Sequence, residues 1–248
     1  MYITSASAST PGRINEDYVC TGGDWAVILD GATAPPRIDS GCVHGVPWIV
    51  RQLTARVAYR LALADMASLP DILAAAIKGT CRAHADTCDL TNPNSPSSTV
   101  SMLRLCNNSL DYLTLGDSPI ILWHTDHSFT PIIDDRTSHL PGGRPYTLEV
   151  VQNHRNKAGG FWVASTNTDA AYQAISGSVE VSHLTEAALF TDGITRLLDW
   201  YGYTWPEIFG HLRENGPVSL ISLVRAEEAK GHPFGKQHDD ASVIYWNL

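Results

Sequence analysis

Two apolar segments of this chain each end in Asp-Gly, and a pair of aspartates opens a third. The first, WAVILDG, contains Asp30; the second, EAALFTDG, contains Asp192; the third, DDASVIYW, starts at Asp239. Short apolar runs bounded by turn residues are typical of buried β-strands. Carboxylates gathered at strand ends from distant parts of a chain are the ligands that hard cations such as Mg²⁺ and Mn²⁺ prefer. The pattern therefore favours a metal site at one edge of a β-structure.

Paired divalent ions have a specific chemical use. Two such ions close together activate a water molecule and stabilise the leaving oxygen of a phosphoryl group. The three aspartates therefore favour a metal-dependent phosphoester hydrolase. Each Asp-Gly motif by itself indicates only a hairpin turn, because Asp-Gly after an apolar run is common there.

Composition and charge narrow the class of protein. The chain has 248 residues, 44% hydrophobic and 17% charged, which suits one large domain or two small ones. Its net charge of −9 and lack of a basic cluster argue against nucleic-acid binding, which needs clustered Lys and Arg. There is no basic-then-apolar leader and no apolar run of about 18 residues, so we expect no membrane segment. We expect the protein to be cytoplasmic and monomeric.

The cysteines give no sign of a disulfide framework or a zinc ribbon. They are odd in number and irregularly spaced, at Cys20, Cys42, Cys81, Cys88 and Cys106. No Cys-x-x-Cys pair occurs, and such pairs are the usual signature of zinc ribbons. Reduced thiols in a cytoplasmic protein are therefore the expectation.

Strand and helix patterns occur in blocks along the chain. In order, they predict strands at 2–8 and 17–30, helices within 42–66 and from Pro70, strands at 98–106, 110–117, 119–126 and 128–133, strands within 179–191, helices between 194 and 230, and a strand at 241–246. Hairpin-linked strands favour antiparallel sheets, and helices in blocks favour the α+β class over alternating α/β. The simplest packing is a β-sandwich of two antiparallel sheets flanked by helices on both faces.

The segment between residues 134 and 160 contains Pro, Gly and Arg without a clear period, so we expect it to be irregular. Connections of this length are often functional. We expect the segment to border the active-site cleft and to influence the choice of substrate. Its first residues, Asp134 and Asp135, are expected to form a solvated acidic loop.

Six motifs follow one another along the chain: GRINEDY, VILDGAT, SSTV, LTLGDSP, LFTDGITR and HDDASVIYW. In this order and spacing they resemble the metal-dependent protein phosphatases of the PPM (type 2C) family, in its bacterial form. The resemblance extends from Ile3 to Trp246 and implies one domain over residues 1–248. It implies a β-sandwich with helices on both faces and a metal centre at one end. It also implies two core Mn²⁺ or Mg²⁺ ions, with a third in bacterial members.

The resemblance implies a role for each residue of the core metal site. Asp30 would bridge the two ions, and the carbonyl of Gly31 would bind one of them. Asp192 and Asp239 would hold the other ion. Asp240 stands where the family has asparagine, and its extra carboxylate is expected only to tune the field of the site.

Three further roles follow from the resemblance. Asp17 would hold metal-bound waters, and Asp117 resembles the ligand of the weaker third ion. Arg13 resembles the arginine that grips the substrate phosphate, a task that suits a guanidinium because it pairs with phosphate oxygens bidentately. Arg13 lies one residue closer to Asp17 than is usual, and Arg37 is the next candidate.

No general acid is identified by the resemblance. Animal members have a histidine directly after Asp-Gly, whereas Ala32 occupies that position here, as often in bacterial members. The nearest histidine is His44, which we expect to be structural or exposed.

The implied activity is hydrolysis of phosphomonoesters, with phosphoserine and phosphothreonine in proteins as the usual substrates. A phosphorylated small molecule is an alternative, because the metal centre recognises mainly phosphate and water. A non-catalytic binding module is another, although such chains usually lose a metal aspartate and all three are present here. A GDS-type ester hydrolase with Ser118 as nucleophile is disfavoured, since no Asp-x-x-His element exists.

Overall fold

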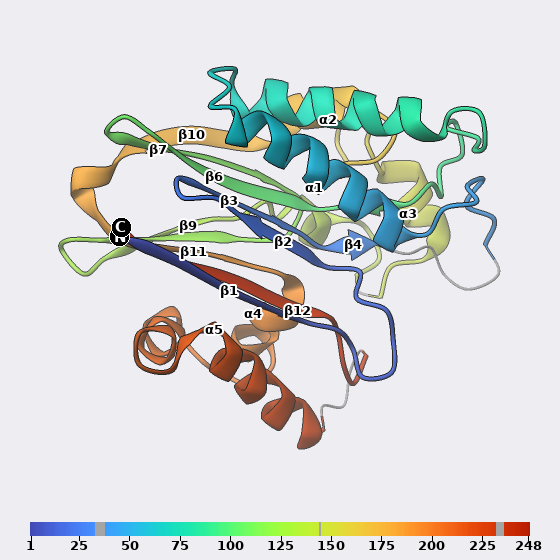
Figure 1. The fold of residues 1–248 in the computed structure, drawn as a ribbon. Coiled ribbons are helices and arrows are strands. Elements are labelled where there is room, and N and C mark those ends of the chain that lie inside the picture. The colour runs from blue at the N-terminus through green and yellow to red at the C-terminus, as the bar shows by residue number, and fades with distance from the viewer. Residues whose placement is uncertain (33–37, 144, 232–235) are drawn as a thin grey trace.

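The structure, a computed structural model, describes residues 1–32, 38–143, 145–231 and 236–248 (Figure 1). Arg37, the alternative phosphate-binding arginine, lies outside the described residues. Two antiparallel sheets of five strands pack face to face, and helices cover both outer surfaces. This is the sandwich predicted from the sequence.

The two sheets have different strand orders. One has the order β1 (Tyr2–Ala8), β12 (Ala241–Asn247), β11 (Leu184–Phe190), β8 (Ile120–His124) and β9 (Phe129–Ile132). The other has the order β10 (Ile175–Glu180), β7 (Ser109–Leu115), β6 (Val100–Cys106), β3 (Trp25–Leu29) and β2 (Tyr18–Thr21). A small third sheet pairs β4 (Gly31–Ala32) with β5 (Ser97–Ser98). Each large sheet therefore combines strands from distant parts of the chain.

Helices form the outer layers. Those that pack on the sheet containing β3 are α1 (Val46–Ala62) and α2 (Leu69–His84), and those that pack on the sheet containing β12 are α4 (Asp192–Asp199) and α5 (Trp205–Ala229). The remaining helical segments are α3 (Leu148–His154), η1 (Arg136–His139), η2 (Thr168–Gln173) and η3 (Val181–His183). Hydrophobic cores lie beneath each helical layer and between the two sheets. Within the described residues, no helix combines the length and apolar content needed to cross a membrane.

The sequence explains several of these elements. All five residues of β3 are buried, as expected for a strand with packed layers on both sides. Helix α1 begins at Val46 rather than near Cys42, because residues 42–45 form a loop. Helix α5 is bent at Gly216, whose φ of 75° is not helical. Pro217 follows and removes a helical hydrogen-bond donor.

Two expectations for the long irregular segment are wrong. The segment contains helix α3, and Thr147 caps this helix by accepting a hydrogen bond from the N–H of Val150 (3.3 Å). Asp134 is only 2% exposed rather than solvated, whereas Asp135 is exposed as expected. Its carboxylate pairs with Arg136 (2.5 Å) and accepts a hydrogen bond from the N–H of Gly116 (2.9 Å). The local partners, rather than water, therefore satisfy this carboxylate.

The motif aspartates meet at one end of the sandwich. In antiparallel pairing, the end of one strand lies beside the start of its neighbour. Asp30 follows β3 and Asp192 follows β11. Asp17 precedes β2 and Asp239 precedes β12. Asp117 lies between β7 and β8. The two chain ends lie together at the opposite end, where Tyr2 pairs with Asn247 (Figure 1).

Candidate metal centre

Asp30 and Gly31 leave β3 in a position fixed by hydrogen bonds. The Asp30 N–H donates to Oγ1 of Thr99 (3.2 Å). The Asp30 carbonyl accepts from the N–H of Thr99 (2.9 Å) and from the hydroxyl of Ser98 (2.9 Å). A side chain at Gly31 would collide with Val46, the first residue of α1. The glycine therefore lets this turn lie directly against α1.

Asp192 is the first residue of α4. Its N–H donates to the Asp30 carboxylate (3.4 Å), which places the two motif aspartates side by side. The next residue, Gly193, has no space for a side chain because it lies against the backbone carbonyl of Asp240. The two Asp-Gly motifs are thus contact points between distant elements rather than hairpin turns.

Asp17 is the most buried of these aspartates, with 3% of its surface exposed. Its Oδ2 accepts a hydrogen bond from the hydroxyl of Thr191 (2.8 Å). Its Oδ1 is buried and has no hydrogen-bond partner among the described residues. Burial raises the pKa of Asp17 to about 8, against the opposing effect of hydrogen bonds from Ser242 and Thr191. A metal ion or a metal-bound water would satisfy such an oxygen.

The aspartates raise one another's pKa values. Burial, followed by the charges of Asp192, Asp17, Asp117 and Asp239, raises the pKa of Asp30 well above its usual value. Burial and the charges of Asp239 and Asp117 raise the pKa of Asp192 to about 6. Because Asp192 is exposed to the cleft, its charged neighbours are the more convincing cause. Bound divalent cations would remove this repulsion.

Asp239 differs from the other aspartates because it has cationic partners. Its Oδ2 forms an ion pair with Arg196, and its Oδ1 lies 3.5 Å from Nζ of Lys236. Arg196 also pairs with the buried Glu228 (3.3 Å). Sequence reasoning missed Arg196. Its place four residues after Asp192, on the same face of α4, is the signal that could have identified it.

Asp240 holds the loop between β1 and β2. One carboxylate oxygen accepts a hydrogen bond from the N–H of Thr10 (2.6 Å), and the other accepts from the N–H of Glu16 (2.6 Å). In asparagine an NH2 group replaces one of these two oxygens, and this donor could not accept the corresponding hydrogen bond. Asp240 therefore fastens the loop that carries Arg13 and Asp17, a structural task beyond the expected tuning of charge.

Arg13 is not brought into contact with the aspartates. It is exposed, in a turn where its N–H donates to the carbonyl of Thr10 (3.0 Å) and Gly12 has a φ of 75°. Its side chain forms no hydrogen bond or ion pair with another residue in the described part of the chain. The structure therefore leaves its guanidinium available to an external anion.

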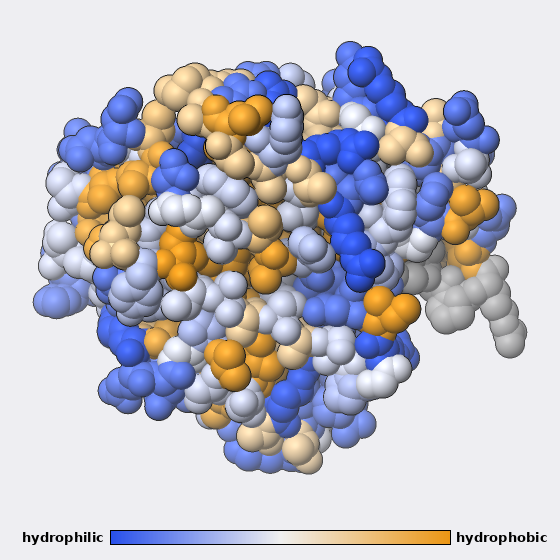
Figure 2. Space-filling view, in the orientation of Figure 1, coloured by the Kyte–Doolittle hydropathy of each residue, from blue (hydrophilic) through white to orange (hydrophobic). Residues whose placement is uncertain are grey.

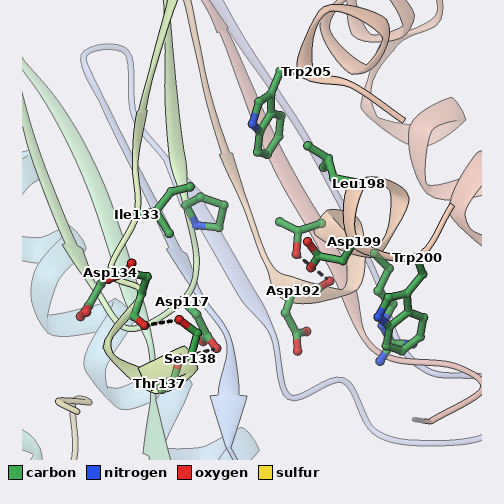
Figure 3. A pocket seen from close by; sticks show the side chains of 14 residues that line it. Asp117, Ile133, Asp134, Thr137, Ser138, Asp192, Leu198, Asp199, Trp200 and Trp205 are labelled. Carbon is green, nitrogen blue, oxygen red and sulfur yellow. Dashed lines mark hydrogen bonds between the residues drawn. The ribbon is translucent and has the colours of Figure 1, made fainter. Parts of the chain in front are cut away.

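A pocket of about 520 Å³ adjoins the aspartates. Asp117, from the turn between β7 and β8, and Asp192, from α4, line the same pocket (Figure 3). Asp117 also accepts a hydrogen bond from the hydroxyl of Thr137 (3.3 Å). The wall includes residues 134–135 and 137–138, so the start of the long segment borders the cleft, as predicted.

Ser118 is not placed to act as a nucleophile. It is fully buried, and its hydroxyl is hydrogen-bonded to the hydroxyl of Thr99 (2.6 Å). A nucleophile must reach the substrate, so this geometry rules out the ester-hydrolase alternative.

Comparison with known proteins agrees with this architecture. The family model for protein phosphatase 2C matches residues 6–225. One similar solved structure is the Mycobacterium tuberculosis serine/threonine phosphatase PstP/Ppp, with 18% identity, a TM-score of 0.67, and coverage of 100% of this chain and 98% of that one. Stp1 from Staphylococcus aureus has 15% identity, a TM-score of 0.63, and coverage of 99% and 94%.

A third similar structure is the catalytic domain of PstP in complex with two manganese ions. It has 19% identity and a TM-score of 0.60, with coverage of 98% of this chain and 96% of that one. No curated protein matches the chain. The structural likenesses confirm the two-sheet fold that the motifs predict.

Proposed function

The chain belongs to the protein phosphatase 2C family, and we propose that its aspartate cluster binds two Mn²⁺ or Mg²⁺ ions for the hydrolysis of phosphoserine and phosphothreonine in proteins. The observation that carries this proposal is the buried Oδ1 of Asp17, an acceptor without a donor among the described residues. It lies in a group of carboxylates whose pKa values burial and mutual repulsion raise. A dinuclear metal site would offset both features.

The chain's own residues divide the work. Asp30 would supply oxygen ligands to both ions and the carbonyl of Gly31 would bind one of them, while Asp192 and Asp239 would hold the other ion. Asp17 would accept hydrogen bonds from metal-bound water through its Oδ1. When bound, the ions lower the pKa of a water molecule and stabilise charge on the phosphoryl oxygens.

Two residues are proposed to support this centre from its edges. Arg196 would be a positioning residue, because its ion pair fixes one carboxylate oxygen of Asp239. Asp117 and Asp192, which line the same pocket, would share a third and weaker ion. Arg13, exposed and unpaired among the described residues, would bind the substrate phosphate with its guanidinium.

We propose that the enzyme acts as a monomer in the cytoplasm. All five cysteines are free, which supports a reducing compartment. On the face shown in Figure 2, apolar side chains occur in small separate patches among hydrophilic ones. Large continuous apolar patches are typical of stable interfaces, so this face favours a monomer. Light scattering coupled to size-exclusion chromatography would measure the mass directly.

The deciding experiment is turnover of p-nitrophenyl phosphate and of matched phosphopeptides, with and without excess EDTA. We expect activity with Mn²⁺ or Mg²⁺, little with Zn²⁺, and none in EDTA, because the proposed ligands are oxygens suited to hard cations. Phosphoserine and phosphothreonine peptides should be better substrates than a panel of phosphorylated metabolites. Full activity in EDTA would contradict the metal mechanism, a preference for a metabolite would contradict the substrate class, and no turnover would indicate a binding module.

A further inference from the structure

Four metal-binding side chains converge outside the aspartate cluster. Cys42 and His44 lie in the loop before α1, His84 is the last residue of α2, and Cys88 lies just beyond it. Each offers one ligand atom, and the four atoms lie within 4.8 Å of one another. The antiparallel helices α1 and α2 bring the two pairs together, although some forty residues separate them in the sequence.

The spacing of these atoms matches a tetrahedral metal site. Sγ of Cys42 lies 3.7 Å from Nδ1 of His44 and 3.4 Å from Nδ1 of His84. Sγ of Cys88 lies 3.4 Å from Nδ1 of His44. Bond lengths of about 2.3 Å to sulfur and about 2.0 Å to nitrogen give sulfur–nitrogen edges of about 3.5 Å in a tetrahedron. The ligand atoms therefore already stand near the corners that a metal ion would need.

We propose that Cys42, His44, His84 and Cys88 bind one Zn²⁺ ion in a structural site separate from the aspartate cluster. Two thiolates and two imidazoles suit Zn²⁺, whereas Mn²⁺ and Mg²⁺ prefer the oxygen ligands of the other centre. Four protein ligands close the coordination shell, which is the arrangement of structural rather than catalytic zinc. This inference does not depend on the proposed phosphatase activity.

The surroundings hold the ligands in place. The ring of Trp48 stacks on His44 with centroids 4.0 Å apart and packs against His84 at 5.1 Å. His84 is 2% exposed, and its Nδ1 is directed to the cluster, where it contacts Sγ of Cys42. Its Nε2 has no hydrogen-bond partner among the described residues. Backbone contact adds to this, because the N–H of Asp89 donates to the carbonyl of Gly41 (2.7 Å). Side-chain packing and a backbone hydrogen bond therefore hold the Cys42–His44 pair beside the His84–Cys88 pair.

Zinc at this position would anchor the start of α1. The loop with Cys42 and His44 leads directly into Val46, which packs against Gly31 of the aspartate centre. His44 is half-buried, consistent with the expected structural role, but its partners are metal ligands. The absence of a Cys-x-x-Cys pair argues against a zinc ribbon, yet it does not exclude a site assembled from Cys-x-His and His-x-x-x-Cys.

The test measures bound metal rather than activity. Protein purified under reducing conditions from zinc-supplemented cells should contain about one zinc per chain by mass spectrometry of metals. Cys42→Ser and Cys88→Ser should each lose most of it, whereas Cys106→Ser, at a half-buried cysteine outside the cluster, should keep it. Asp239→Asn should also retain zinc, which separates this site from the aspartates.

Cobalt provides a second readout. Co²⁺ added to the metal-free wild type should give the thiolate charge-transfer and tetrahedral ligand-field absorption of a two-cysteine site, saturating at about one equivalent. If a serine variant does not fold, this wild-type spectrum still decides. Wild-type protein without zinc and without the cobalt spectrum would overturn the proposal. Zinc retained in a folded Cys42→Ser or Cys88→Ser variant, or a Cys42–Cys88 disulfide in its place, would do the same.

Discussion

The carboxylates at the two ends of strand β11 differ in whether the chain supplies them with an arginine partner. Near its start, Glu186 is 4% exposed and accepts hydrogen bonds from Nε and a terminal nitrogen of Arg213 (2.8–3.0 Å). The hydroxyl of Tyr245 donates a further hydrogen bond to it. Beyond the other end of the strand, Asp17, Asp30 and Asp192 have no such guanidinium fork among the described residues.

The difference separates a structural carboxylate from a functional one. A buried charge is tolerated when the chain itself supplies the compensating cation and donors. At Glu186 the chain supplies that compensation through Arg213 and Tyr245. At the aspartate cluster the proposed metal ions would supply it, so metal binding should stabilise the folded protein.

Removing one negative charge at either end of β11 should produce the largest difference in turnover between the two ends. Asp192→Asn should lower turnover by roughly a thousandfold, because it removes a metal ligand and its charge. Asp239→Asn should act similarly. Glu186→Gln should leave turnover within about twofold but lower the free energy of unfolding by about 2 kcal/mol, because Arg213 loses charged hydrogen bonds. Steady-state kinetics at saturating Mn²⁺ and urea denaturation would measure these effects, and near-normal turnover in Asp192→Asn would erase the contrast.

The pH dependence of stability should also differ between metal-free and metal-bound protein. Asp17 has a pKa of about 8 when folded, above the unfolded value of about 4, so the folded state binds more protons between these pH values. The unfolding free energy of the metal-free protein should therefore fall as pH rises from 5.5 to 7.5, by roughly 2 kcal/mol. Thermal denaturation in EDTA would measure this, with Asp17→Asn as a control that flattens the profile. A rise in the unfolding free energy over this pH range would contradict the prediction.

Asp117 tests whether the proposed metal site extends beyond its two core ions. It lines the pocket with Asp192, yet it also accepts a hydrogen bond from Thr137 (3.3 Å). We expect Asp117→Ala to lower turnover about tenfold while the two core ions bind normally. Anomalous diffraction from manganese-soaked crystals should show three positions in the wild type and two in the variant. Two positions in both proteins, with unchanged kinetics, would place Asp117 with the structural carboxylates.

Arg13 should give the smallest effect. Arg13→Ala is expected to raise KM about fivefold with little change in kcat, because phosphate is bound in both the ground and the transition state. Arg51→Ala, at another exposed arginine, is the matched control. An unchanged KM would remove Arg13 from the site and leave Arg37 as the candidate arginine.

Sequence patterns predicted the parts of the fold that are governed by continuous apolar runs. Strands β3, β11 and β12 are such runs, and their ends carry the aspartates that the motifs identified. Helix α3 was missed because it has only seven residues, none of them buried, so it shows no hydrophobic period. Strand β10 begins at Ile175, earlier than predicted, and is mostly exposed.

The residues that sequence reasoning missed depend on contacts between distant segments. Arg196 becomes significant only when Asp239 and Glu228 are brought to it by folding. The buried state of Asp134 requires the N–H of Gly116 from another turn. The Cys-His cluster likewise requires α1 and α2 to lie antiparallel. Short spacings, such as Arg196 four residues after Asp192, indicate candidates, but only the fold shows which distant residues they meet.

The double hydrogen bond of Asp240 has a consequence for biosynthesis. It joins segments 224 residues apart, with Glu16 just before β2 and Asp240 just before β12. Until Asp240 emerges from the ribosome, the nascent chain lacks part of the aspartate cluster. Strand β1 also lacks its partner β12. Such long-range closure is slow compared with local folding. With the proposed site, phosphoester hydrolysis would therefore begin only after β12 has left the ribosomal exit tunnel and paired with β1.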